Sequence, residues 1–110
     1  MGPAGPSGTS GFEIRRVSAD TAIAMPANGR NVIYLVLTAP ATVTMTLPPA
    51  SSAAGRFVTI TRIDPGKKVV VKPTGGDMVD GAKSPVSLES KFDSITLVSD
   101  GSEWAVLVMR

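Results

Sequence analysis

The chain has 110 residues, a length that allows one domain with a single hydrophobic core. Only 18% of the residues are charged and the formal net charge is +2, which gives little support to nucleic-acid binding. The chain has no Cys and no His, and this excludes disulfides, thiolate or imidazole metal sites, and Cys–His or Ser–His nucleophiles. A hydrophobic share of 43% beside so few charges predicts apolar surface left over for oligomerisation. No segment reaches the roughly 18–20 apolar residues that span a bilayer, so we expect no membrane insertion.

Residues 1–11 are rich in glycine, proline and serine. Glycine occupies every third position: Gly2, Gly5, Gly8 and Gly11. Only glycine fits at the crowded axis of three intertwined polyproline-II chains. The spacing therefore favours the end of a collagen-like stalk over residues 1–11, followed by a β-rich domain over residues 12–110. A flexible linker, or a leftover of expression, is the alternative interpretation.

Two short apolar runs follow, at residues 12–17 and 21–25. In the first run Phe12 and Ile14 alternate with charged residues, as in a half-buried strand. The adjacent Arg15 and Arg16 favour a solvated sheet edge that discourages edge-to-edge pairing, with an anion site as the less favoured alternative.

Residues 31–38 are continuously apolar and rich in branched side chains, which predicts a strand buried on both faces. In so small a domain, burial on two sides suggests that one face meets another subunit. Residues 42–47 alternate strictly, with Val43 and its apolar partners on one face and threonines on the other. The threonine face is interpreted as a solvated surface of good β-propensity rather than as a site for a partner or sugar.

Residues 48–55 read as a loop with room for one helical turn, and residues 56–63 as a long strand. Asp64-Pro65-Gly66-Lys67 has the composition of a tight turn. The apolar run at residues 68–72 then predicts a return strand, so that residues 56–72 would form a hairpin.

Residues 73–82 are the most site-like stretch, because Gly75-Gly76 offers backbone amides and Asp77 and Asp80 offer two carboxylates. A Ca²⁺ loop needs more oxygen ligands at fixed spacing, and the phosphate-loop pattern is absent. The favoured interpretation is a pair of turns around a one-rung strand, in which each carboxylate bonds local amides. The sequence thus predicts no metal and no cofactor.

Residues 84–89 predict a short edge strand, and two apolar runs flank Asp100-Gly101 near the end of the chain. Asp-Gly suits a tight turn with positive φ, so residues 95–109 predict a β-hairpin around which the rest of the chain is organised. Trp104 is the only tryptophan. A lone tryptophan just after a hairpin turn is expected to anchor a core or an interface rather than to stack on a sugar.

Five segments carry a family resemblance: the Gly-X-Y triplets, the Thr/Val-rich residues 42–48, the strand at residues 55–60, the segment at residues 71–81, and the closing residues 95–104. Together they resemble the terminal domains of bacteriophage and prophage tail-fibre-like proteins with collagen-like repeats. The resemblance implies a trimeric, non-enzymatic module that registers or caps a collagen-like stalk, on a virion tail fibre or another extracellular surface.

We therefore expect an all-β domain of about eight to ten short strands, mostly antiparallel, in a sandwich or barrel-like arrangement. The expected state is a homotrimer around a threefold axis, with a shared β-prism as one form of it. Trimerisation would bring three stalk ends together and make triple-helix nucleation intramolecular. The alternative function is a fibre tip that binds a host cell-surface glycan or protein through Trp104, Asp77 and Asp80. An enzyme such as a glycosidase, which needs two carboxylates across a cleft, is not expected, because the chain is short for a substrate cleft and most carboxylates sit beside turn residues: Asp64, Asp77, Asp80 and Asp100.

Overall fold

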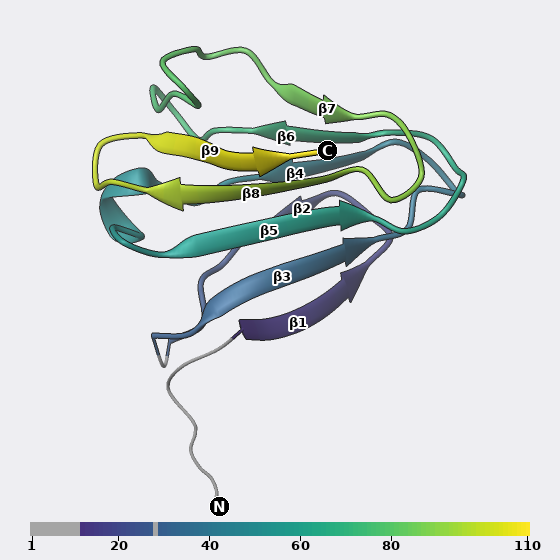
Figure 1. The fold of residues 1–110 in the computed structure, drawn as a ribbon, viewed down its shortest axis with the longest axis horizontal. Helices are drawn as coiled ribbons and strands as arrows, with labels where there is room; N and C mark the ends of the chain where they lie inside the picture. The colour runs from purple at the N-terminus through teal and green to yellow at the C-terminus, as the bar shows by residue number, and fades with distance from the viewer. Residues whose placement is uncertain (1–11, 28) are drawn as a thin grey trace, which may run out of the picture.

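The computed structural model describes residues 12–27 and 29–110, which fold into nine strands in two facing sheets (Figure 1). The strands are β1 (Phe12–Val17), β2 (Thr21–Ala22), β3 (Asn31–Val36), β4 (Val43–Thr46), β5 (Phe57–Arg62), β6 (Val69–Lys72), β7 (Val86–Leu88), β8 (Ser94–Ser99) and β9 (Trp104–Met109). Sheet A has the order β1-β3-β5-β8-β9, and sheet B has the order β2-β4-β6-β7. The all-β class and the sandwich-like architecture are confirmed, whereas the barrel is not formed because neither sheet closes.

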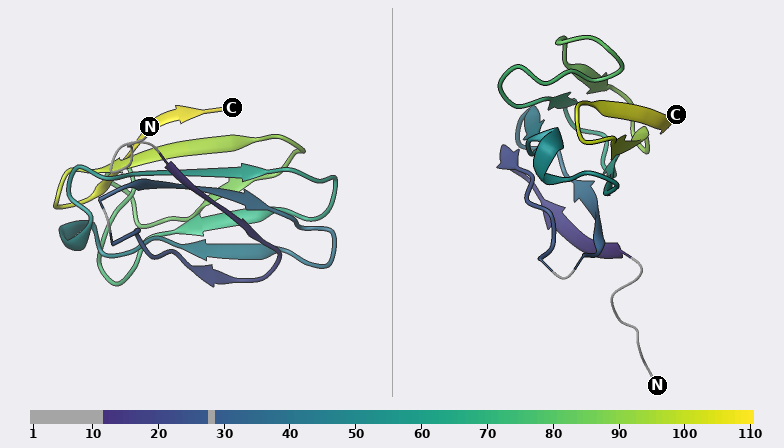
Figure 2. Two further views of the ribbon diagram at one scale, coloured as in Figure 1. Left: turned by 90° about the horizontal axis from the view of Figure 1, so that it is seen from below. Right: turned by 90° about the vertical axis from the view of Figure 1, so that its left-hand side faces the viewer.

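The strands are less antiparallel than the sequence predicted, because the first six strands alternate between the two sheets. β1, β3 and β5 pair in parallel within sheet A, while β2, β4 and β6 pair in parallel within sheet B. The chain thus winds through successive coils, each with one strand in each layer (Figure 2). Only the last three strands add antiparallel pairs, with β7 on β6, β8 on β5 and β9 on β8.

The predicted hairpin over residues 56–72 is wrong, because β5 lies in sheet A and β6 in sheet B. The turn at residues 64–67 carries the chain from one layer to the other. This turn forms a backbone hydrogen bond with the preceding coil, because the C=O of Thr38 accepts from the N–H of Lys67 at 2.9 Å. Equivalent turns therefore stack on each other, and the strands on either side of each turn do not pair.

A repeat of 26 residues underlies this stacking and was visible in the sequence as two Gly-Arg pairs, Gly29-Arg30 and Gly55-Arg56. Both glycines have positive φ, 80° and 76°, a conformation that glycine adopts without steric cost. The guanidinium of Arg56 donates a hydrogen bond to the C=O of Arg30, one coil earlier. Because internal repeats of 20–50 residues are typical of stacked coils, this spacing was the signal that could have predicted the topology.

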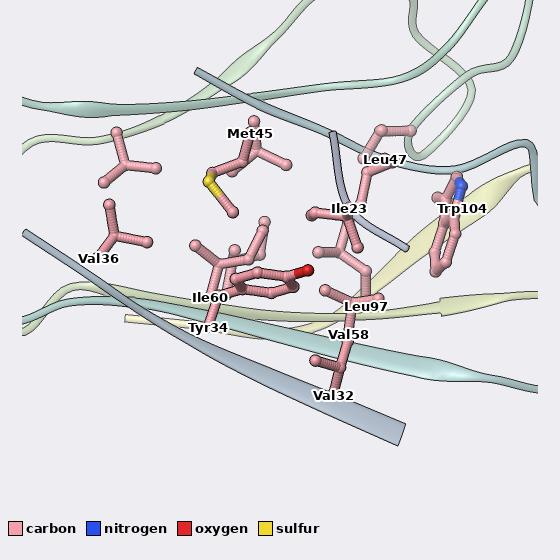
Figure 3. Close-up of a cluster of buried hydrophobic side chains, with 14 of the residues drawn as sticks. Ile23, Val32, Tyr34, Val36, Met45, Leu47, Val58, Ile60, Leu97 and Trp104 are labelled. Atoms are coloured by element: carbon pink, nitrogen blue, oxygen red, sulfur yellow. The ribbon is translucent and has the colours of Figure 1, made fainter. Parts of the chain in front are cut away.

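The core lies between the sheets and consists mainly of Val, Ile, Leu and Met side chains (Figure 3). Val32, Val58 and Ile60 from sheet A are fully buried, as are Val43 and Met45 from sheet B. These positions alternate with outward-facing ones, as the period of two in the sequence predicted for β4 and β5. Burial of each such side chain contributes roughly 1.5–3 kcal/mol.

The C-terminal hairpin is confirmed, with β8 and β9 joined by a loop in which Gly101 has a φ of 95°. The helical turn predicted between residues 48 and 55 is present as η1 (Ala50–Ser52). The short edge strand predicted within residues 84–89 is also confirmed, because β7 forms one border of sheet B.

Candidate assembly surface

The outer face of sheet A, here called face A, carries several large exposed apolar side chains, mixed with polar ones such as Arg16, Thr59 and Thr96. The register of the strands places its side chains in rows that cross the whole sheet. Its apolar members are Phe12, Ile14, Ile33, Leu35, Phe57, Val98, Ala105 and Val108. Ile14 is 64% exposed and Val108 is 57% exposed. Water therefore covers large hydrophobic side chains at both borders of this sheet.

The strand predicted to be buried on both faces explains how face A arises. In β3, Val32, Tyr34 and Val36 are buried in the core, whereas Ile33 and Leu35 on the opposite face are only half-buried. The expectation of two-sided burial is thus wrong for the single chain. The same strand supplies the centre of the apolar surface, because its side chains are hydrophobic on the outer face of the sheet as well as on the core face.

The outer face of sheet B is polar and gives a contrast within the same molecule. Its central row runs from Thr44 through Val70 to Ser87, and a neighbouring row holds Thr46 and Lys72. Thr and Lys side chains are stable in contact with water. The two outer faces of the sandwich therefore differ in polarity, because face A carries several large apolar side chains, whereas these rows of sheet B carry only Val70.

Arg15 in β1, which the sequence predicts on a solvated edge, lies on the core side of sheet A beside Tyr34. Its guanidinium donates hydrogen bonds to the carboxylate of Glu13 at 2.6 Å and to the hydroxyl of Tyr34 at 2.9 Å. It also donates to the C=O of Ala24 at 2.7 Å. The hydrogen bonds to Tyr34 and Glu13 raise the pKa of Arg15 above its ordinary value. Arg16, the other member of the pair, is exposed and faces outward beside Leu35.

Trp104 lies in the core rather than on the surface. Its side chain is 0% exposed, and the indole N–H donates a hydrogen bond to the C=O of Pro48 at 3.0 Å. Figure 3 shows the ring beside Leu47 at one end of the hydrophobic cluster. In this position the ring offers no exposed face on which a sugar could stack.

Asp77 and Asp80 hold distant parts of the backbone together. The carboxylate of Asp77 accepts a hydrogen bond from the N–H of Ala50 at 2.8 Å. The carboxylate of Asp80 accepts one from the N–H of Val106 at 2.9 Å, which lies in β9. The expectation that these carboxylates bond local amides is therefore corrected, because their partners are 27 and 26 residues away.

The glycine triplets, with Gly2, Gly5, Gly8 and Gly11, lie outside the described residues. Within the described part of the chain, no group of three or more acidic side chains is placed to hold a metal ion. No helix there is long and apolar enough to cross a membrane. No pocket is found in the structure of residues 12–27 and 29–110.

Comparison with known proteins yields no matching family model and no significantly similar curated protein. The interpretation of the surface therefore depends on its own chemistry.

Proposed function

We propose that this domain is a non-enzymatic structural module that forms a homotrimer and sets the register of a collagen-like fibre. Its partners are two further copies of itself and the adjoining stalk. The fibre is proposed to be a phage tail fibre, so that the domain would reside on a virion or at another extracellular surface. The single observation that carries the proposal is the apolar character of face A.

Face A supports self-association because its exposed side chains are costly to leave in water. Burial of apolar surface contributes roughly 25 cal/mol for each Å² removed from water. Phe12, Ile14 and Val108 are all large and exposed. Stable interfaces between subunits are large and more apolar than transient ones, and face A extends over all five strands of sheet A.

The position of the glycine triplets supports three copies in particular. Gly11 immediately precedes Phe12, the first residue of β1 and a member of face A. Three chains of a triple helix lie in contact around one axis, so their C-terminal ends must converge. If the triplets form such a helix, the three β1 strands start close to that axis. Face A, which begins with β1, then turns towards the same axis.

The test is the mass of the protein in solution, measured by light scattering after size exclusion over a dilution series. The proposal predicts three times the mass of the 11.3 kDa chain, maintained on dilution into the micromolar range. A monomer at micromolar concentration would contradict it and would favour a ligand-binding β domain attached to a flexible linker.

A further inference from the structure

Sheet A ends in two borders whose backbone edges are open over part of their length. β1 forms one border and β9 the other. The first half of β9 is covered, because Trp104 exchanges backbone hydrogen bonds with Met78 and Asp80 at 3.0 and 2.9 Å. The carboxylate of Asp80 also accepts a hydrogen bond from the N–H of Val106, so this donor is not available to another strand. Within the described residues, no hydrogen bond from outside sheet A reaches the edge beyond that point, where Leu107, Val108 and Met109 are each more than half exposed.

The hydrogen-bond alternation of the strands shows which backbone groups reach these edges. Arg110 and Ser94 exchange both backbone hydrogen bonds, at 2.9 and 3.0 Å. The antiparallel alternation then directs the N–H and C=O of Met109 away from β8. In β1, the C=O of Val17 bonds the N–H of Leu37 on the β3 side. Alternate residues face opposite neighbours, so Ile14 presents its backbone groups to the open edge.

We infer that the free end of β9, residues 107–109, pairs with β1 of a neighbouring copy and extends sheet A from one subunit to the next. The inference rests on the proposed function, since it specifies how the copies of the trimer join. Three such junctions would close the three copies of sheet A into a ring with face A inside. One arrangement would then cover both the apolar face and the unpaired edges.

Strand direction supports this junction. β1 and β5 share one direction, β8 opposes β5, and β9 opposes β8, so β9 runs parallel to β1 (Figure 1). Rotation about a threefold axis that follows the strands leaves their direction unchanged. β9 therefore meets β1 of the next copy as a parallel pair, which continues the parallel pattern of β1, β3 and β5. An isologous pairing of two β9 edges would instead be antiparallel and would stop at a dimer.

Charge and length are also compatible with edge pairing. β9 contains no charged residue and no proline, the two devices by which natural edge strands avoid pairing. β1 carries three charges, but Glu13 and Arg15 form an ion pair within the chain, and Arg16 is the only one of the three on face A. Its partner β1 is 6 residues long, and although the C=O of Phe12 accepts a hydrogen bond from the guanidinium of Arg30 at 2.7 Å, the remaining 5 residues exceed the 3 residues of the open stretch of β9. A short parallel ladder with apolar side chains on face A is thus available at each of the three junctions.

Cysteine cross-linking tests the junction, because the chain has no cysteine of its own. Ile14, Arg16 and Val108 all point to face A. Two double variants are prepared, one with Ile14→Cys and Val108→Cys and the other with Arg16→Cys and Val108→Cys. After mild oxidation, at least one of them is expected to give covalently linked trimers on a denaturing gel. The single variants are expected to remain single chains. The matched control combines Val108→Cys with Val70→Cys, which lies on the outer face of sheet B and should form no cross-link.

The outcomes separate the junction from the trimer itself. A protein that is trimeric by light scattering, but in which neither double variant cross-links, overturns the edge pairing and leaves the proposed trimer intact. Cross-linked dimers from Ile14→Cys alone overturn it too, because they require β1 to meet β1. A monomeric mass overturns both proposals. Amide hydrogen exchange supplies a second readout on the unmodified protein. The N–H of Met109 is expected to exchange at least about tenfold more slowly in the trimer than in a dissociated chain, and equal exchange contradicts the pairing.

Discussion

The carboxylate of Asp64 accepts a hydrogen bond from the backbone of Thr38, a residue in the adjacent stacked coil that lies 26 residues earlier in the chain. One carboxylate oxygen accepts hydrogen bonds from the N–H and the hydroxyl of Thr38 at 2.8 and 2.9 Å, and the other accepts one from the N–H of Ala39 at 2.8 Å. Thr38 itself is buried, and the C=O of Lys67 lies 3.0 Å from the same hydroxyl, so its single proton is shared between the carboxylate and this carbonyl. These hydrogen bonds therefore fix the corner where the chain crosses from sheet A to sheet B.

Asp64 is expected to make stability depend on pH. The backbone N–H of Thr38, its hydroxyl and the N–H of Ala39 hold the pKa of Asp64 below its ordinary value of 3.8. A carboxyl with a lowered folded-state pKa stabilises the fold above its unfolded-state pKa, and this contribution disappears as the pH falls through the folded-state value. We expect Asp64→Asn to lower the unfolding temperature at pH 7, and we expect the difference between the two proteins to shrink as the pH falls below 3.8.

Thermal unfolding of the two proteins, followed by circular dichroism between pH 7 and pH 2, measures this convergence. Asp100, whose pKa is also lowered, is unchanged in both proteins and cancels in the comparison. A destabilisation that stays the same across the whole range would contradict the role of the ionised Asp64 carboxylate.

Gly66 is expected to be intolerant of a side chain. A Cβ atom at this position would lie 2.3 Å from the backbone carbon of Thr38 and 2.3 Å from the N of Ala39, so the stacked coils would have to separate. We expect Gly66→Ala to lower the free energy of unfolding by at least about 3 kcal/mol. Gly76→Ala is the matched control, because a Cβ at Gly76 meets nothing within 4 Å. Urea unfolding of both variants gives the comparison, and equal stabilities would refute the close approach.

Trp104 is expected to report burial directly, since it is the only tryptophan in the chain. Its fluorescence should be blue-shifted in the native protein and should resist quenching by iodide until the protein unfolds. Trp104→Phe removes the donor to the C=O of Pro48, and we expect a loss of roughly 1–3 kcal/mol in the free energy of unfolding. Strong iodide quenching under native conditions would contradict the core position.

Ile14 is expected to matter for assembly but not for the fold of a single chain. Its side chain is 64% exposed, so Ile14→Glu removes little intramolecular packing. In a trimer that buries face A, the variant places an unpaired charge in each interface, which costs roughly 3 kcal/mol or more. We expect the mass to fall to that of the monomer at micromolar concentration, with the β-sheet circular dichroism retained.

The control for this prediction is Val70→Glu, which makes the same kind of change on the outer face of sheet B. It is expected to leave the mass unchanged. If Ile14→Glu and Val70→Glu both leave the oligomeric state unchanged, face A is not the interface between copies.

The positions of most strands, and the side of each strand that faces the core, follow from local patterns in the amino-acid sequence. The alternation of Val43 and Met45 with threonines predicts the buried side of β4, and Asp100-Gly101 predicts the terminal turn. These features are local, because a pleated strand has a period of two and a tight turn needs particular φ angles. The interpretation of face A as a contact surface began with the continuous apolar run that became β3.

The pairing of the strands, in contrast, depends on contacts between distant parts of the chain. The turn at residues 64–67 has the composition of a hairpin turn, yet it joins two sheets, because Asp64 and Lys67 bond to the previous coil rather than to a facing strand. The carboxylates of Asp77 and Asp80 likewise accept hydrogen bonds from backbone amides that are 27 and 26 residues away in the chain. Each strand could pair with several other segments that are distant in the chain. The pairing is settled by burial and by long-range hydrogen bonds, which no short stretch of sequence contains.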